Sequence, residues 1–307
     1  MADLRIQLAP FNAKGLSLAN PVMAASGILG YGTEYSELID IQKLGAIVCK
    51  GTTLNPRNGN PQPRLVETSF GVLNSIGLQN IGVEALIRDK APVWARWQVP
   101  VIVNIAGDTV DEYARIALRL EGVVGISGLE INISCPNIAR GAREFGADPK
   151  AAAEVTKAVK SNTSLPVIVK LPPGIDVVEV AVAVSEAGAD AVTLVNTIHG
   201  IAIDIANRRP VLGNIHGGLS GPAMKSIALY AVYHVAGAVK VPIIGCGGIV
   251  SAEDALQFIM AGATAVQIGS ACLTDPRTPL KVLHGIERFC EKEGVEKIAD
   301  IIGIARK

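Results

Sequence analysis

The chain has 307 residues, 49% of them hydrophobic and 4% aromatic, and its 28 basic and 28 acidic residues leave no net charge to attract nucleic acid or an anionic membrane. No apolar run approaches the roughly 18 residues of a membrane span. Residues 1–10 lack the apolar core of a secretion signal. The five cysteines are odd in number and form no C-x-x-C pair, which argues against a disulfide framework. We therefore expect a cytoplasmic protein that binds small molecules.

Short apolar segments recur along the chain, each entered after a Pro or after a small-residue helix end. In chain order, the predicted strands are residues 21–25, 45–50, 100–104, 128–133, 166–170, 188–196, 242–246 and 262–269. Their Val, Ile, Leu and Ala content, with few aromatic residues, is typical of parallel strands that helices cover on both faces.

Helical patterns separate most of these strands and carry start signals. Pro stands at a first helical position in Asp148-Pro149, Gly221-Pro222 and Thr278-Pro279, and Ser251 to Asp254 approximates a capping box. Eightfold alternation with right-handed crossovers predicts an α/β fold, a closed (β/α)8 TIM barrel that forms a single domain over residues 1–307. An open doubly wound sheet is the alternative, but no G-x-G-x-x-G motif follows the first strand.

Two connections are too long for plain loops, and both follow predicted strands. They are Thr52 to Val93 and Thr197 to Gly221. We expect them to be insertions over the C-terminal face of the barrel, with Asn55 to Pro63 folding as a lid or hairpin over the site. An insertion without a functional role is the alternative.

Polar and glycine residues follow the predicted strands, where a barrel places its working groups. They are Ser26, Lys50, Asn104, Asn132, Lys170, Asn196, Gly247, Gly248, Gly269 and Ser270. Because glycines let backbone N–H groups approach an anion, the last four suit a phosphate, with Ser251 opening the next helix. A simple tight turn at Gly247-Gly248 is the alternative.

Lys50 and Lys170 each end an apolar strand, where a cation needs a negative or polar partner. Either could form a Schiff base, as in barrel aldolases, or both could stabilise negative charge on a cofactor and a substrate. The alternative to both roles is a lysine without a chemical function, whose amine simply reaches the solvent.

A set of carboxamides favours the second of these hypotheses. Its members are Asn74, Asn104, Asn132, Asn137 and Asn196. Together they offer uncharged donors and acceptors, as a cyclic imide or an isoalloxazine edge requires.

Cys135 lies between Asn132 and Asn137, just after a predicted buried strand that Pro136 ends. A thiol there can act as a nucleophile, as a general base or as an inert group, and neighbouring cations or amide donors would activate it. No metal site is expected, because the four histidines form no H-x-x-x-H pair.

These residues give the chain a resemblance to the dihydroorotate dehydrogenase family, which are flavin barrels of pyrimidine biosynthesis. The similar motifs span Leu4 to Gly303 and comprise Ala25-Ser26-Gly27, Lys50-Gly51-Thr52, Asn74 to Asn80, Asn132 to Asn137, Val195-Asn196-Thr197, Gly217 to Pro222 and Gly245 to Gly248. The resemblance implies one FMN per chain, bound by Ser26, Lys50, Gly51, Asn104, Asn132, Lys170, Val195, Gly221, Gly247, Gly248, Gly269 and Ser270.

The same resemblance implies that the substrate is dihydroorotate, oxidised to orotate. Its binding residues would be Lys50, Asn74, Ser75, Ile76, Gly77, Leu78, Asn132, Asn137, Asn196 and Thr197. Cys135 would act as the base, and Lys170 would stabilise negative charge on the reduced flavin. The loop Ile138 to Ala147 would close over the substrate.

The class within the family also follows from resemblance. Phe145 to Pro149 and Asn207 to Asn214 are similar to the NAD-linked class, in which a second subunit carries FAD and an iron–sulfur cluster. The resemblance also implies a homodimer of this chain within a heterotetramer. The chain has no ferredoxin-like cysteine run and no dinucleotide fingerprint of its own, which supports a partner protein. A fumarate-linked homodimer would show the same absences. More remote alternatives are a flavin-free lyase that uses Lys170, a pyrimidine-reducing module and a non-catalytic scaffold.

Overall fold

The computed structural model describes residues 2–35, 37–133, 145–174 and 176–306. Eight parallel strands close into a barrel, and each strand pairs with its neighbours in chain order. The strands are β3 (Val22–Ala24), β4 (Ala46–Val48), β7 (Val101–Ile105), β8 (Gly128–Asn132), β9 (Val167–Leu171), β10 (Ala191–Leu194), β15 (Ile243–Cys246) and β16 (Ala265–Ile268). All eight predicted strands and the predicted closed barrel are confirmed.

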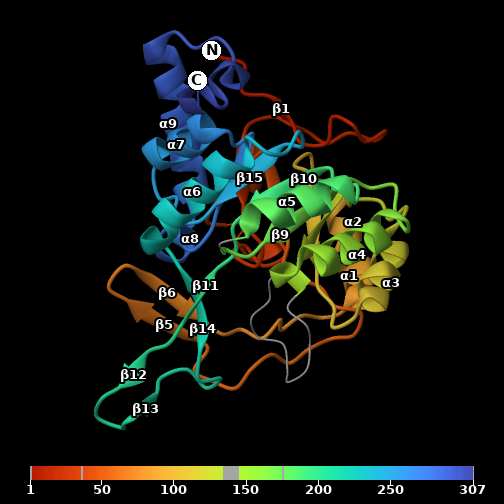
Figure 1. Ribbon diagram of the computed structural model, residues 1–307, viewed down its shortest axis with the longest axis vertical. Helices are drawn as coiled ribbons and strands as arrows, with labels where there is room; N and C mark the ends of the chain where they lie inside the picture. Colours follow the sequence, from red (N-terminus) through yellow and green to blue (C-terminus); the bar gives the residue numbers. More distant parts are fainter. Residues whose placement is uncertain (1, 36, 134–144, 175, 307) are drawn as a thin grey trace.

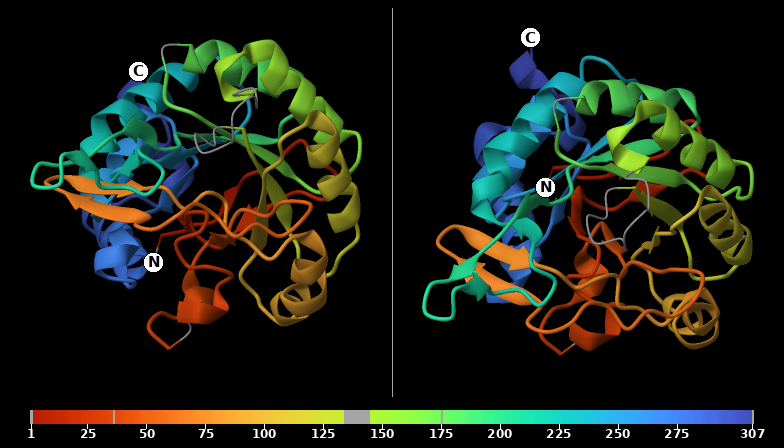
Figure 2. Two further views of the ribbon diagram at one scale, coloured as in Figure 1. Left: turned by 90° about the horizontal axis from the view of Figure 1, so that it is seen from below. Right: turned by 60° about the horizontal axis from the view of Figure 1, so that its bottom comes forward.

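Helices surround the barrel and cover the outer face of its strands (Figure 2). They are α1 (Val83–Asp89), α2 (Ala91–Trp94), α3 (Val110–Leu120), α4 (Pro149–Lys160), α5 (Val177–Glu186), α6 (Lys225–Val235), α7 (Ala252–Ala261), α8 (Ala271–Thr274) and α9 (Thr278–Glu293). Asp148 caps α4 ahead of Pro149, and Ser251 and Asp254 form the full capping box of α7. Pro222 differs from the prediction, since it opens a 3-10 turn, η4 (Pro222–Met224), that leads into α6.

Polar side chains meet inside the barrel. Gln267 of β16 donates to Glu130 of β8 at 2.7 Å, although three strands separate β16 from β8 on either side of the ring. The bond therefore crosses the barrel interior. Asn104, Lys170 and Thr193 are buried with this pair.

The two long connections form one antiparallel sheet beside the barrel mouth. Its order is β11 (Ile198–Gly200), β14 (Gly217–Ser220), β6 (Gly71–Asn74) and β5 (Leu65–Thr68), with a two-stranded extension of β12 (Ile203–Asp204) and β13 (Arg209–Pro210). Figure 1 shows this sheet beyond one end of the barrel. The hairpin predicted at residues 55–63 was misplaced, because it spans residues 65–74. The three prolines of residues 55–63 supply no ladder N–H, and only a single bridge, Arg57 to Asn80, forms there.

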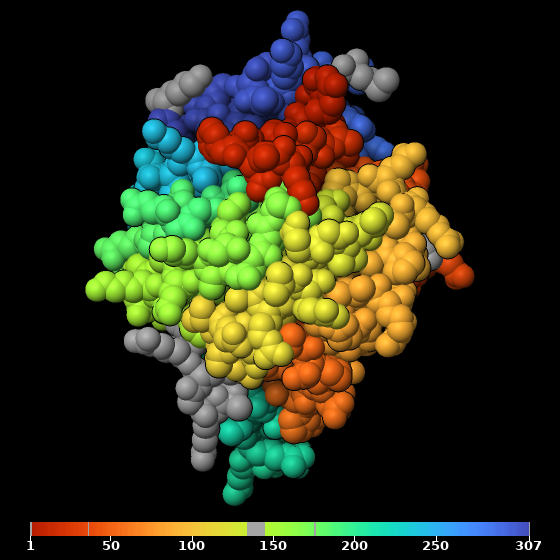
Figure 3. All heavy atoms as spheres, turned by 90° about the vertical axis from the view of Figure 1, so that its right-hand side faces the viewer, coloured from red at the N-terminus to blue at the C-terminus, as the bar shows by residue number. Residues whose placement is uncertain are grey.

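The remaining elements are short. They are β1 (Ile6–Gln7), β2 (Ser17–Leu18), η1 (Thr33–Tyr35), η2 (Ile41–Lys43), η3 (Phe145–Ala147), η5 (Ile298–Ile301) and η6 (Ile304–Arg306). The N-terminal segment lies against the C-terminal segment at the end opposite the inserted sheet (Figure 3), and a bridge between Asp3 and Lys297 joins them. Among the described helices, none combines the length and the hydropathy that crossing a bilayer requires.

Candidate active site

A cavity of about 340 Å³ lies at the C-terminal ends of the barrel strands, and the inserted sheet forms one of its walls. The predicted residues that line it are Ser26, Lys50, Gly51, Asn74, Ile76, Gly77, Leu78, Asn104, Asn132, Lys170, Val195, Asn196, Thr197, Gly221, Gly247, Gly248, Gly269 and Ser270. Leu65, Val72 and Leu219 of the inserted sheet line it as well. Residues from all along the chain are thus brought together around one space large enough for a ring-shaped ligand.

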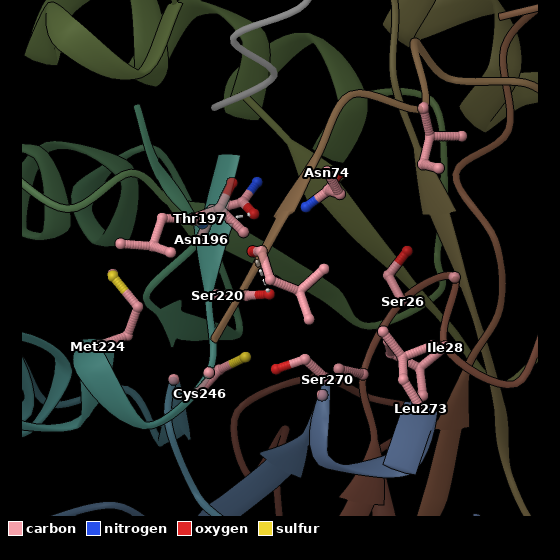
Figure 4. Close-up of a pocket in the computed structure, with 18 of the residues that line it drawn as sticks. Ser26, Ile28, Asn74, Asn196, Thr197, Ser220, Met224, Cys246, Ser270 and Leu273 are labelled. Carbon is pink, nitrogen blue, oxygen red and sulfur yellow. Dashed lines mark hydrogen bonds between the residues drawn. The ribbon is translucent and has the colours of Figure 1, made fainter. Parts of the chain in front are cut away.

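The lining has two chemically different ends. Figure 4 shows Asn74, Asn196 and Thr197 at one side of the cavity and Cys246 and Ser270 at the other. One end is therefore rich in amides, and the other end carries the glycine turns that follow β15 and β16.

At the amide end, side chains hold one another in place. Asn196 Nδ2 donates to Asn132 Oδ1 at 3.3 Å, and Asn196 Oδ1 accepts from the backbone N–H of Thr197 at 2.8 Å. Asn74 Nδ2 donates to the carbonyl of Gly218 at 3.2 Å, so strand β14 orients it. Tyr113 of α3 anchors the β8 terminus through a bond from its hydroxyl to the Asn132 carbonyl at 2.7 Å. These amides are pre-oriented for a ligand with paired donors and acceptors.

Lys170 occupies the barrel end of the cavity and is 5% exposed. Its Nζ lies 3.1 Å from Gln267 Oε1 and 3.7 Å from Cys246 Sγ. Burial alone would lower the pKa of Lys170, but the adjacent Cys246 sulfur and the Glu130 carboxylate act in the opposite direction, and the net shift is upward. Burial raises the pKa of Cys246, while the neighbouring Lys170 cation acts in the opposite direction.

The surroundings of Lys50 lower its pKa, in contrast to those of Lys170. Burial lowers the pKa of Lys50, and the positive charge of Arg64 lowers it further, while Glu34 opposes both effects weakly. A cation held beside another cation favours an anionic ligand, which would relieve the repulsion. Lys50 is therefore suited to bind a carboxylate.

Asn104 presents an acceptor that has no partner among the described groups. Its Nδ2 donates to Glu130 Oε1 at 2.8 Å, and its Oδ1 is buried without a hydrogen bond. A buried acceptor without a donor is costly. Since Asn104 lines the cavity, a ligand N–H would satisfy this oxygen.

The fold requires glycine at Gly248, at the other end of the cavity, but it does not require glycine at Gly269. Gly248 has φ of +71°, and a Cβ there would lie 2.6 Å from the backbone nitrogen of Lys225, so the fold itself demands glycine. A Cβ on Gly269 would meet only Ala25 Cβ, at 3.9 Å, so packing permits alanine there. The open side of Gly269 faces the cavity instead and admits close approach of a ligand.

The start of α7 contributes less than the sequence indicated. Asp254 Oδ2 accepts the N–H groups of Val250 and Ser251 at 3.0 and 3.1 Å, so a carboxylate of the chain already uses these donors. The backbone N–H groups of Gly248 and Ser270 donate to no other described group. They are the donors available to an anion at this end.

Comparison with known proteins identifies the family. The sequence model described as dihydroorotate dehydrogenase matches residues 9–290. The chain belongs to the dihydroorotate dehydrogenase family. A relative from Desulforamulus reducens is 53% identical over 94% of this chain and 96% of its own length, and one from Pelobacter propionicus is 52% identical over 95% and 96%. Both relatives are named dihydroorotate dehydrogenase B (NAD(+)), catalytic subunit.

A solved structure supports the dihydroorotate dehydrogenase fold. The crystal structure of a DHODH from Eimeria tenella in complex with ferulenol matches with a TM-score of 0.82, covering 99% of this chain and 89% of that chain. The sequence identity is 22%, so the likeness concerns the fold alone.

Three predicted dihydroorotate dehydrogenase residues are not seen at the cavity. Cys135 and Asn137 lie outside the described residues. Ser75 is fully buried and does not line the cavity; its hydroxyl accepts from Asn60 Nδ2 at 3.1 Å. Its buried position fixes the loop that carries Asn74 and Ile76.

Sequence reasoning missed the polar residues inside the barrel strands. Glu130, Thr193 and Gln267 are each fully buried, and Glu130 accepts from the other two at 3.0 and 2.7 Å. A signal was present, because a charged residue two positions before Asn132 in an apolar strand must share its face. Among the described residues, no cluster of His, Cys, Asp and Glu could hold a metal ion.

Proposed function

We propose that this chain is the catalytic subunit that oxidises dihydroorotate to orotate in de novo pyrimidine biosynthesis, as a single barrel domain over residues 1–307 with one bound FMN. The observation that carries the proposal is the cavity, which joins an amide end, a buried lysine and a glycine end at one barrel mouth. The names of relatives that share about half of its residues support the same reaction.

The cavity fits FMN on grounds independent of the family. The unpartnered Oδ1 of Asn104 would accept from a ring N–H. The backbone N–H groups of Gly248 and Ser270 are available to a phosphate, and Gly269 leaves open space for it. The full proposed set is Ser26, Lys50, Gly51, Asn104, Asn132, Lys170, Val195, Gly221, Gly247, Gly248, Gly269 and Ser270. FMN bound there would supply a hydride acceptor, and Lys170 would hold positive charge beside it.

The amide end would bind the pyrimidine ring. We assign the substrate to Lys50, Asn74, Ser75, Ile76, Gly77, Leu78, Asn132, Asn137, Asn196 and Thr197. Lys50 would pair with the substrate carboxylate, which offsets the repulsion between Lys50 and Arg64. The oriented amides of Asn74 and Asn196 would read the ring edge.

Cys135 is the proposed base. It would remove a proton from a ring carbon while the hydride leaves the neighbouring carbon. Ile133 and Gly146 flank its segment, and the Gly146 N–H donates to the Ile133 carbonyl at 2.9 Å. We propose that the loop Ile138 to Ala147 closes over the substrate.

The proposed electron acceptor is NAD, reached through a second subunit that carries FAD and an iron–sulfur cluster. The phrase "catalytic subunit" in the names of the relatives supports a second subunit, and "NAD(+)" in the same names supports the acceptor. We propose a homodimer of this chain within a heterotetramer, in the cytoplasm, where the buried thiols of Cys49, Cys246, Cys272 and Cys290 stay reduced.

A flavin-free lyase that uses Lys170 is disfavoured. Schiff-base chemistry needs a neutral amine, whereas the surroundings of Lys170 raise its pKa and keep it charged. Sodium borohydride with a keto acid should therefore trap no adduct on this chain.

The test begins with the purified chain. It should be yellow with one FMN per chain, and anaerobic dihydroorotate should bleach the flavin. The chain together with its electron-transfer subunit should then reduce NAD, while fumarate should not reoxidise the flavin at a comparable rate. A colourless protein that dihydroorotate leaves unchanged would contradict the proposal.

A further inference from the structure

One carboxylate, Glu130, organises the barrel interior beneath the cavity. It is fully buried, and it accepts from three side chains on three other strands. Asn104 Nδ2 donates to Oε1 at 2.8 Å, and Thr193 Oγ1 and Gln267 Nε2 donate to Oε2 at 3.0 and 2.7 Å. A buried charge is tolerated only where it is paired and hydrogen-bonded, and here three donors meet it.

This carboxylate fixes which way two amides face. Because the NH2 group of Asn104 points to Glu130, its Oδ1 is left unpartnered as an acceptor. Because the NH2 group of Gln267 also points to Glu130, its Oε1 is turned to Lys170 Nζ, 3.1 Å away. An ionised carboxylate accepts and cannot donate, so neither amide can flip without placing two acceptors together.

Glu130 also sets the charge balance around Lys170. Glu130 of β8 and Cys246 of β15 are the titratable groups that act on Lys170 among the described residues. Cys246 Sγ lies 3.7 Å from Lys170 Nζ, and Glu130 is the carboxylate of the pair. Gln267 of β16 and Thr193 of β10 complete the described shell and are uncharged. Glu130 is thus the carboxylate among the described residues that acts on a lysine buried to 5% exposure.

We propose that Glu130 is a positioning residue for the cofactor side of the reaction, which keeps Lys170 cationic and holds Asn104 and Gln267 in their working orientations. The inference rests on the proposed function, since it concerns the FMN site. Glu130 lies behind Asn104 and Lys170 and does not line the cavity itself, so its effect passes through them.

The variant Glu130→Gln would test the charge with nearly the same shape. The introduced amide offers only one acceptor oxygen to the donors that now meet a carboxylate, so Asn104 or Gln267 must turn. A second variant, Glu130→Gln with Gln267→Glu, moves the carboxylate across the barrel and keeps the total charge. The carboxylate that Gln267→Glu introduces would face Lys170 directly, and the amide oxygen that Glu130→Gln introduces would still accept from Asn104.

The readout is the midpoint potential of bound FMN, measured in each protein and in its Lys170→Met counterpart. The difference within each pair isolates the charge of Lys170. In the wild type we expect this difference to stay constant from about pH 6.5 to about pH 9.5, below the ordinary lysine range of about 10.4. In Glu130→Gln it should shrink as the pH rises, with its midpoint at least about one pH unit below that of the wild type, a tenfold change in acidity.

The exchange variant should restore the constant difference. A constant difference in Glu130→Gln would overturn the proposal, because a residue that only fills space would not alter how Lys170 titrates. If Glu130→Gln binds no FMN, the exchange variant decides the question: a pH-independent difference supports the proposal, and a pH-dependent one overturns it. Failure of the wild type to bind FMN would instead remove the proposed function.

Discussion

Lys225 Nζ lies 2.8 Å from Asp254 Oδ1, and this ion pair joins α6 to α7 directly beside the Gly247-Gly248 turn. The other oxygen of Asp254 accepts the N–H groups of Val250 and Ser251. One carboxylate therefore ties together both helices that support the glycine end of the cavity. The fold positions this end through a charged contact that no ligand needs to touch.

Asp254→Asn should weaken both the fold and FMN binding. The variant loses a charge-assisted bond and leaves Lys225, which is 32% exposed at its side chain, partly unpaired. We expect a loss of about 1 to 3 kcal/mol in the free energy of unfolding, measured with urea, and a higher dissociation constant for FMN. Glu287→Gln, at an exposed position of α9, removes the same charge and is the control. Equal stability of the two variants would show that the ion pair contributes nothing.

Gly248→Ala and Gly269→Ala should separate the needs of the fold from those of the ligand. Gly248→Ala places a Cβ 2.6 Å from the Lys225 nitrogen at positive φ, so unfolding free energy should fall by about 1 to 3 kcal/mol. Gly269→Ala meets only Ala25 Cβ at 3.9 Å, so stability without FMN should change by less than about 0.5 kcal/mol. Its dissociation constant for FMN, measured by fluorescence, should nevertheless rise at least about tenfold, a loss of about 1.4 kcal/mol. Unchanged FMN affinity in Gly269→Ala would move the phosphate away from this turn.

The barrel was predictable from local sequence, and the inserted sheet was not. Each barrel strand is a Pro- or Gly-bounded apolar run with a helix behind it, so its type could be inferred within about ten residues. In the inserted sheet, Asn74 pairs with Gly218, a partner 144 residues away, and no local pattern reveals such a pairing. Prolines in residues 55–63 indicated a turn but did not show which neighbouring segment would pair.

The residues that line the cavity could also be predicted from local sequence, whereas the buried polar residues beneath the cavity could not. Residues such as Lys50 and Asn196 stand at strand ends, which a barrel gathers at one mouth. Glu130 lies within a strand, and its partners Asn104, Thr193 and Gln267 come from three others. Their meeting depends on the stagger of the closed barrel, which sequence periodicity does not supply.

Acid should destabilise the protein partly through Glu121. Hydrogen bonds from the side chains of Ser164 and Thr163 lower the pKa of Glu121 from 4.5 to about 2. A carboxylate with a depressed pKa in the folded state adds stability above its unfolded pKa, and that stability is lost as the pH falls through the folded value. The loss should appear between about pH 4.5 and about pH 2.

Urea unfolding at several acidic pH values would show this contribution. In Glu121→Gln the decline over that window should be shallower than in the wild type, since the titrating group is gone. Glu287→Gln, on the exposed face of α9, should follow the wild-type curve. Parallel curves for Glu121→Gln and the wild type would contradict the assignment.

Lys50 should make orotate binding sensitive to alkaline pH. Burial first and then Arg64 lower its pKa, so the positive charge that pairs with a carboxylate is present below that pKa and is lost as the pH rises through it. Orotate affinity of the oxidised protein should therefore decline at a lower pH than an ordinary lysine would cause. Lys50→Met should bind orotate at least about tenfold more weakly at neutral pH, about 1.4 kcal/mol, without this decline. A titration followed by the flavin absorbance measures both, and an unchanged alkaline decline in Lys50→Met would assign it to another group.

Cys135→Ala should nearly abolish flavin bleaching by dihydroorotate at neutral pH while FMN stays bound. A general base contributes about 10²- to 10⁴-fold, so stopped-flow reduction should slow by about that factor, and Cys135→Ser should slow it as well because a hydroxyl is a weaker base. Cys272→Ala is the matched control, since burial raises the pKa of Cys272 to about 12 and leaves it an inert thiol. If Cys135→Ala reduces FMN as fast as the wild type, Cys135 is not the base.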